Sequence, residues 1–268
     1  MIPNILSIAG SDPSGGAGIQ ADIKAISANG GYAMAVIAAL TAQNTRGVRG
    51  FTVVAPDMVR SQIETIRDDI RIDAIKIGML GDAAIVRTVA EVLGTIDAPV
   101  VLDPVMVAKG GDRLLAEEAV AALRDLLVPR AAILTPNLPE AGDLLGRAPA
   151  QDIESMREQG EALLALGCKA VMMKGGHLPR GEAIDLLVTD DDTVELEAPR
   201  TNTKNTHGTG CTLSSALATA LGAGFAPIEA ARRAKAYIGA AIGAADTLSV
   251  GSGNGPVHHF HWRSPGLA

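Results

Sequence analysis

A cysteine that follows two glycines stands in the stretch NTHGTGCTLSSALATALG at 205–222. The residues after it are small and compatible with a helix, and the first N–H groups of a helix have no intrahelical acceptor. Glycine also lets the chain turn so that several of these groups converge. The backbone of Gly208, Thr209, Gly210 and Cys211 therefore predicts an anion site, for a transferred phosphoryl group or an acyl oxygen.

The same stretch has a simpler interpretation as a capped helix, with Thr206 or Thr209 as the N-cap residue. Cys211 itself has three candidate roles: a nucleophile, a proton acceptor or a small buried side chain. A helix N-terminus favours its thiolate, whereas a bound phosphate opposes it. His207 lies four residues before Cys211, so the pair also fits a thiol hydrolase.

Charged residues follow three apolar, strand-like runs. Lys174 is the last residue of the strand-like run in VMMKGGH. Because burying a lone lysine is unfavourable, it needs a triphosphate or a carboxylate as partner. Asp103 in VVLDPV and Glu140 in LTPNLPE can supply the one or two carboxylates that Mg²⁺ takes together with water and substrate oxygens. Capping of a helix N-terminus is the alternative role for Glu140, and a structural ion pair is the expected role of Lys76.

The stretch GSDPSGGAGIQAD at 10–22 contains G-x-G-x-x-A between a predicted strand and a predicted helix, as in dinucleotide-binding proteins. That pattern needs an acidic residue about 20 positions later for the ribose, but residues 23–56 contain no Asp or Glu. We therefore exclude a nicotinamide cofactor, and the absence of G-x-x-x-x-G-K-[ST] excludes a P-loop. Asp12 and Asp22 favour a polar ligand with amine or hydroxyl donors.

Short apolar runs alternate with helical patterns, which predicts an α/β fold with a mostly parallel sheet buried on both faces. Strands are expected at 4–10, 33–40, 73–79, 99–105, 131–136 and 169–176. Helices are expected at 18–29, 56–70, 82–94, 114–127, 138–145, 152–166, 208–222 and 227–245. AIDLLVTD and TVELEA predict a hairpin at a mixed edge. Ligands of such sheets bind beyond the carboxyl ends of the strands, where Asp12, Gln43, Gly78, Asp103, Thr135 and Lys174 fall.

Composition narrows the class of protein. The 268 residues carry 23 Lys and Arg against 30 Asp and Glu, for a net charge of −7, and aromatic residues make up 2%. No basic stripe or stacking platform for nucleic acid is present. Two cysteines form no disulfide framework, and no apolar run approaches the roughly 18 residues of a membrane span. We expect one cytoplasmic domain over 1–268, with the histidine-rich tail at 258–262 exposed or docked rather than a zinc site.

Seven stretches, in order along the chain, together resemble the hydroxymethylpyrimidine/phosphomethylpyrimidine kinase family. They are IAGSDPSGGAGIQADIKA, TAQNTRGV, KIGML, VLDPVM, LTPNLPEA, MKGGH and KNTHGTGCTLSSALA. This family is part of the ribokinase-like superfamily, on its pyridoxal-kinase-like branch. The resemblance implies a three-layer α/β/α sandwich and transfer of the ATP γ-phosphoryl group to the hydroxymethyl of an aminopyrimidine, and then to the resulting monophosphate. Pyridoxal, another flat heteroaromatic alcohol, is the alternative substrate.

The resemblance also implies roles for individual residues and a homodimer. Pyrimidine-binding residues would be Gln43 and Asp22, with Gly10, Met79 and Val105 shaping the pocket. ATP would contact Lys174, Thr206 and Thr209, while Mg²⁺ would be held by Asp103 and Glu140, mostly through water. Gly208, Thr209, Gly210 and Cys211 would form the anion hole. An aspartate base ends this motif in the wider superfamily, and Cys211 stands in its place here. A kinase-fold binding protein without catalysis is a further alternative.

Overall fold

The computed structural model describes residues 1–106, 115–178 and 183–263. The strands in this part of the chain form one sheet in the order β3-β2-β1-β4-β5-β6-β7-β8-β9. Their bounds are β1 Asn4–Ser11, β2 Tyr32–Asn44, β3 Gly47–Val53, β4 Ala74–Ile77, β5 Val100–Leu102, β6 Ile133–Leu134, β7 Val171–Lys174, β8 Asp185–Val188 and β9 Thr193–Leu196.

The six central strands, from β2 to β7, run parallel, and the two edges of the sheet are antiparallel. The predicted hairpin is confirmed as β8 and β9. The other edge strand, β3, was not predicted. It is mostly exposed and reads GVRGFTV, so glycine and arginine interrupt the apolar pattern that marks a buried strand.

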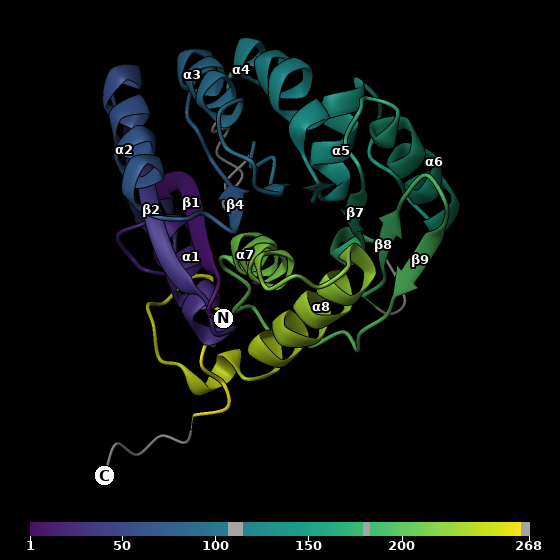
Figure 1. The fold of residues 1–268 in the computed structure, drawn as a ribbon. Helices are drawn as coiled ribbons and strands as arrows, with labels where there is room; N and C mark the ends of the chain where they lie inside the picture. Colours follow the sequence, from purple (N-terminus) through teal and green to yellow (C-terminus); the bar gives the residue numbers. More distant parts are fainter. Residues whose placement is uncertain (107–114, 179–182, 264–268) are drawn as a thin grey trace.

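Helices cover both faces of the sheet (Figure 1). One face carries α2 Pro56–Asp69, α3 Ala83–Leu93, α4 Glu117–Ala122, α5 Leu138–Leu145 and α6 Ile153–Leu164. The other carries α1 Gly18–Ala28, α7 Thr209–Gly222 and α8 Pro227–Gly243. Each layer packs its apolar residues against the strands in a separate core. The predicted three-layer α/β/α arrangement with a mostly parallel sheet is confirmed.

The helix expected at 114–127 differs from the prediction. Its first residue, Leu114, lies outside the described residues, and α4 spans only Glu117–Ala122 before one π turn, Leu123–Leu127, and a 3-10 turn, Val128–Arg130. Pro129 explains this ending, because proline cannot donate the N–H bond that would continue a helix. No helix in the described part of the chain is long and apolar enough to cross a membrane.

The C-terminal segment returns to pack on α7 and α8. The His258 N–H donates to the Ala241 carbonyl at 3.0 Å, and the Tyr237 hydroxyl donates to the His259 carbonyl at 2.9 Å. Nε2 of the buried His259 lies 3.0 Å from Oγ1 of Thr212. The tail is therefore docked, one of the two predicted possibilities, and one of its histidines is attached to the helix that carries Cys211.

We expect acid to weaken the fold through His259. Burial, with smaller contributions from Lys24 and His258, lowers the pKa of His259 to about 4, from 6.5. The unfolded chain therefore binds more protons between these values. The free energy of unfolding is fully present above pH 6.5 and falls as the pH drops toward 4, by up to about 3 kcal/mol.

Urea unfolding at a series of pH values from 7 to 4 measures this loss. A His259→Gln variant should show a shallower dependence on pH, whereas His258→Gln should keep most of the dependence, because it removes only the last of the three causes of the shift. Parallel curves for the original protein and His259→Gln would assign the acid sensitivity to other groups.

Candidate active site

The N-terminus of α7 is built around Gly208. This N-cap residue adopts φ 77°, a left-handed conformation, and makes no side-chain cap bond. A Cβ on Gly208 would lie 1.8 Å from the Gly16 carbonyl oxygen, so only glycine permits this approach of two loops. The capped-helix interpretation with Thr206 or Thr209 at the N-cap is wrong. Thr209 is instead the first helical residue, and its hydroxyl donates to the Thr206 carbonyl at 2.8 Å.

Most of the predicted anion donors remain available. The Thr209 N–H donates weakly to the Thr206 carbonyl at 3.4 Å. The N–H groups of Gly208, Gly210 and Cys211 have no acceptor anywhere in the described residues. They stand at the positive end of the α7 dipole, an arrangement that binds anions.

Lys174 lies beside these donors, between two carboxylates. Its Nζ is 2.8 Å from Oδ1 of Asp103 and 3.7 Å from Oε2 of Glu140. A Cβ on Gly210 would lie 3.3 Å from the same Nζ and 3.4 Å from Oδ2 of Asp103. Parallel pairing of β5, β6 and β7 aligns their carboxyl ends, which is why residues so far apart in sequence meet at one edge.

The charges of this group depend on one another. Burial alone would lower the pKa of Lys174, but the carboxylates of Asp103 and Glu140 outweigh it and raise that pKa. Burial raises the pKa of Glu140 to about 7, with Lys174 opposing and Asp103 adding to the shift. Lys174 therefore stays protonated and holds the two carboxylates together.

Glu140 has the helix-capping role that was predicted as its alternative, and its role toward Mg²⁺ stays a prediction. It forms a capping box with Asn137, whose N–H donates to Oε2 of Glu140 at 2.8 Å, and it also faces Lys174. Thr135 and Ser214 place their hydroxyls 3.3 Å and 3.4 Å from the Asp103 carboxylate. Two adjacent carboxylates held in this way are a donor set that fits Mg²⁺ sharing its remaining positions with water and phosphate oxygens.

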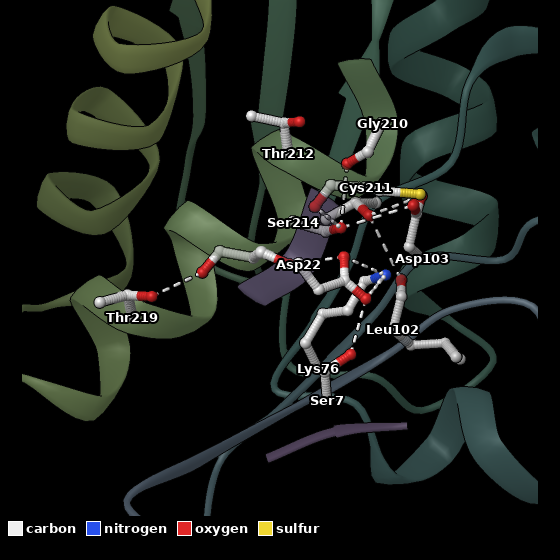
Figure 2. Close-up of polar contacts among 12 residues, drawn as sticks. Ser7, Asp22, Lys76, Leu102, Asp103, Gly210, Cys211, Thr212, Ser214 and Thr219 are labelled. Carbon is white, nitrogen blue, oxygen red and sulfur yellow. Dashed lines mark hydrogen bonds and ion pairs between the residues drawn. The ribbon is translucent and has the colours of Figure 1, made fainter. Parts of the chain in front are cut away.

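Cys211 is half-buried at the start of α7, and Figure 2 shows its sulfur close to Asp103. Burial raises the pKa of its thiol to about 11. The charge of Lys76 and a hydrogen bond from the Gly18 N–H act in the opposite direction, and the charges of Asp22 and Asp103 add to the increase. At neutral pH the resting form is therefore the thiol.

Asp22 lies beneath this region, fully buried. Its carboxylate accepts hydrogen bonds from Ser7 at 2.6 Å, Ser215 at 2.8 Å and Lys76 at 2.9 Å (Figure 2). The expected structural ion pair of Lys76 is confirmed. All three partners of Asp22 belong to the protein itself, so the carboxylate assigned to the pyrimidine by resemblance is engaged inside the fold.

The other residues assigned to the pyrimidine pocket all lie toward the carboxyl edge of the sheet, Gln43 at the end of β2, which runs parallel to β1. The Gly10 N–H donates to the Met79 carbonyl at 2.9 Å, and a Cβ on Gly10 would lie 2.8 Å from Sδ of Met79. Val105 follows β5, with its N–H 2.8 Å from the Asp103 carbonyl. These three residues therefore lie at the carboxyl edge. Gln43 stands near the end of β2, half-buried, and its Oε1 accepts a bond from Thr41 at 3.3 Å.

One buried pair at the site was not predicted. Nε2 of His207 lies 2.7 Å from Oδ2 of Asp12, and both side chains are buried. Asp12 also accepts bonds from the N–H groups of Ser14 and Ala17. Burial raises the pKa of Asp12, but its bonds to His207 and Ser14 outweigh this and lower it. The pair ties the glycine-rich turn at 12–18 to the α7 N-terminus.

The Asp12–His207 pair also bears on the hydrolase alternative. The histidine that would activate Cys211 is engaged with Asp12, and no hydrogen bond joins His207 to Cys211 within the described residues. No local pattern in the sequence could reveal this pair, because the two residues are separated by 195 positions.

A cavity of about 430 Å³ lies between β9 and α8. Its lining combines apolar residues, among them Leu196, Ala198, Ala236 and Ala240, with four charged ones, Glu195, Glu197, Arg232 and Lys235. Lys235 pairs with Asp185 at 2.7 Å, and Asp185 is the partner of Lys174 across the β7–β8 ladder. These two residues connect the cavity to the strand that ends in Lys174.

A family model described as phosphomethylpyrimidine kinase matches residues 12–258 of this chain. The chain belongs to the phosphomethylpyrimidine kinase family. A hydroxymethylpyrimidine/phosphomethylpyrimidine kinase of Salmonella typhimurium is 52% identical over 259 residues, covering 96% of this chain and 97% of the relative. The kinase of that name from Rhizobium meliloti is 51% identical over 256 residues, covering 96% of each chain.

Solved structures agree with this membership of the phosphomethylpyrimidine kinase family. The phosphomethylpyrimidine kinase of Clostridium difficile aligns with a TM-score of 0.78 and 43% identity, over 88% of this chain and 97% of that one. The ADP complex of Bacillus subtilis pyridoxal kinase aligns with a TM-score of 0.90 and 35% identity, over 98% and 99%. The ribokinase-like fold implied by the resemblance is thereby confirmed.

Proposed function

We propose that this protein transfers the γ-phosphoryl group of ATP to the hydroxymethyl group of 4-amino-5-hydroxymethyl-2-methylpyrimidine. A second transfer to the monophosphate gives the diphosphate used in thiamine biosynthesis. The observation that carries the proposal is the meeting of three backbone donors, which find no acceptor among the described residues, with Lys174 and two carboxylates at one edge of the sheet. The names of the relatives support this choice of substrate.

Each group in this arrangement has a task in phosphoryl transfer, which requires mainly positioning and charge stabilisation. The N–H groups of Gly208, Gly210 and Cys211 would donate hydrogen bonds to the phosphoryl oxygens as negative charge develops on these oxygens. Lys174 would bind ATP phosphates, and Asp103 and Glu140 would hold Mg²⁺, largely through water. When bound, the metal neutralises phosphate charge. The protein needs no nucleophile of its own, because an acceptor oxygen of the substrate attacks the γ-phosphorus while ADP leaves.

The cavity between β9 and α8 gives the nucleotide base a place near these phosphate-binding groups. Its apolar lining residues would contact the faces of a flat base, and its charged ones would contact the polar edge, a combination that is usual for small-molecule pockets. Lys235 connects it through Asp185 to the Gly175 N–H, which donates to Asp185 at 3.0 Å. ATP bound in this way would reach from α8 to the α7 N-terminus.

Release of ADP from ATP and Mg²⁺ tests the reaction with three acceptors: the hydroxymethylpyrimidine, its monophosphate and pyridoxal. We expect turnover on the first two. Absence of turnover on both would contradict the proposal, and exclusive turnover on pyridoxal would favour the second candidate, a pyridoxal kinase, which the Bacillus subtilis structure brings into consideration. A thiol hydrolase would instead act without ATP and remain active after chelation of Mg²⁺.

The proposed proton acceptor is Cys211, next to the donors; it would act as the thiolate, which is the minor form at neutral pH because its pKa is raised to about 11. We expect Cys211→Ala to lower kcat by about 10²- to 10⁴-fold, the usual contribution of acid–base catalysis, while ATP binding persists. Initial rates and calorimetric ATP titration measure the two effects. Cys168→Ala is the matched control, because Cys168 is buried and bonds the Leu163 carbonyl. A rate for Cys211→Ala near that of the original protein would exclude this role.

We further propose a homodimer formed through the β2–β3 edge. Leu40 on β2 and Phe51 on β3 are 54% and 39% exposed at this edge, and a partner chain that pairs with the edge would bury them. Light scattering should give twice the chain mass of 27.4 kDa, and Leu40→Glu with Phe51→Glu should reduce it to one. Met58→Glu, at an exposed position of α2, is the control. A single-chain mass at all concentrations would contradict the dimer.

A further inference from the structure

Helices α1 and α7 meet at two points. At the upper point, a Cβ on Gly208 would lie 1.8 Å from the Gly16 carbonyl oxygen and 3.2 Å from Cα of Ala17, the residue that precedes α1. At the lower point, Oγ of Ser215 donates to Oδ1 of Asp22 at 2.8 Å. The lower contact therefore holds α7 against α1 below the close approach of their N-terminal ends.

The lower contact is anchored to the centre of the sheet. Lys76, on β4, and Ser7, on β1, both donate to Asp22, and all of these side chains are fully buried. A Cβ on Gly78 would lie 2.7 Å from Nζ of Lys76, so glycine at that position leaves room for the ammonium group at the carboxyl end of β4. Figure 2 shows Lys76, Asp22 and Ser7 grouped below Cys211.

Stability alone does not explain such a pair. Taking two charges out of water is expensive, and buried ion pairs are often no more stabilising than apolar side chains of similar volume. The directional bonds of Asp22, in contrast, join β1, β4, α1 and α7 at one point. Bonds of this kind fix relative positions, which apolar packing does less strictly.

We propose that Ser7, Asp22, Lys76 and Ser215, the Asp22 cluster, position the first turn of α7 and thereby its phosphoryl-binding N–H groups. Asp22 is then a positioning residue rather than a ligand of the pyrimidine. The inference rests on the proposed function for its catalytic consequence. Its structural part, that the cluster holds the start of α7 in place, is independent of any substrate.

The test compares two hydroxyl deletions in the same helix. Ser215→Ala removes the bond from α7 to Asp22. Thr219→Val removes a buried hydroxyl one turn later that bonds only the carbonyl of Ser215, within α7. We expect Ser215→Ala to lower kcat by about 10-fold and Lys76→Met by about 10²-fold, since small displacements of reacting groups have effects of this size. KM for the pyrimidine should stay within about two-fold, and Thr219→Val should match the original protein.

Hydrogen exchange of the amides at 212–215, measured without substrates, gives a second readout; the first of them, the Thr212 N–H, donates to the Gly208 carbonyl at 2.9 Å. Exchange should be about ten-fold faster in Ser215→Ala, because a loosened first turn opens more often, and unchanged in Thr219→Val. If Lys76→Met does not fold, Ser215→Ala carries the test alone. Faster exchange in a protein that lacks kinase activity would support the cluster and contradict only the proposed reaction.

Two results would overturn the inference. One is unchanged exchange and unchanged kcat in Ser215→Ala. The other is an Asp22→Asn variant that folds and keeps its kcat but has a KM for the pyrimidine raised about ten-fold or more, which would indicate that Asp22 binds the substrate directly.

Discussion

Gly208→Ala is expected to lower kcat by about 10²- to 10³-fold, the usual effect of losing one donor of an oxyanion-type site. A methyl group at this position would lie 1.8 Å from the Gly16 carbonyl oxygen. The loop at 12–18 and the α7 N-terminus would have to separate. The N–H groups of Gly208, Gly210 and Cys211 would then no longer converge on one phosphoryl group.

The matched control is Gly224→Ala. Gly224 also has a positive φ, of 88°, but nothing lies within 4 Å of a Cβ built there. Both variants therefore carry the backbone strain of alanine in a left-handed conformation, roughly 1 kcal/mol. Only Gly208→Ala adds the collision at the site. Equal rates for the two variants, measured by ADP release, would show that this approach of the loops is dispensable.

Lys174→Met is expected to reduce kcat by about 10³-fold, comparable with the loss of a cationic group that stabilises the transferred phosphoryl group. It should also weaken the fold by about 3 kcal/mol, since it leaves the buried carboxylates of Asp103 and Glu140 next to each other without their cation. Lys174 is 2.8 Å from one and 3.7 Å from the other. Steady-state kinetics and urea unfolding measure the two effects separately.

Lys169→Met is the control for Lys174→Met. Lys169 is exposed and precedes β7, at the opposite end of the strand that Lys174 completes. We expect its replacement to change neither the rate nor the free energy of unfolding appreciably. A Lys174→Met variant that is destabilised but fully active would mean that Lys174 serves only the fold.

Local patterns in the sequence predicted most of the helices and strands. A continuous apolar run, a helical periodicity or a proline can each be recognised from residues that are close together in the sequence. The edge strand β3 was missed for the same reason: its exposed GVRGFTV has no such pattern. Parallel strands separated by helices place Asp103 and Lys174 at the same edge of the sheet, so this shared edge was predictable, whereas their ion pair was not.

By itself, the sequence determined the layered α/β fold, the glycine-bracketed start of α7 and the types of charged residue at the strand ends. Only the tertiary structure decided which of these groups meet. It joined Asp12 to His207, placed Lys174 between two carboxylates and enclosed Asp22 with Lys76 and Ser215. The physical reason is that periodicity describes one element at a time. A contact between distant residues depends on strand order and on the packing of helices across the sheet.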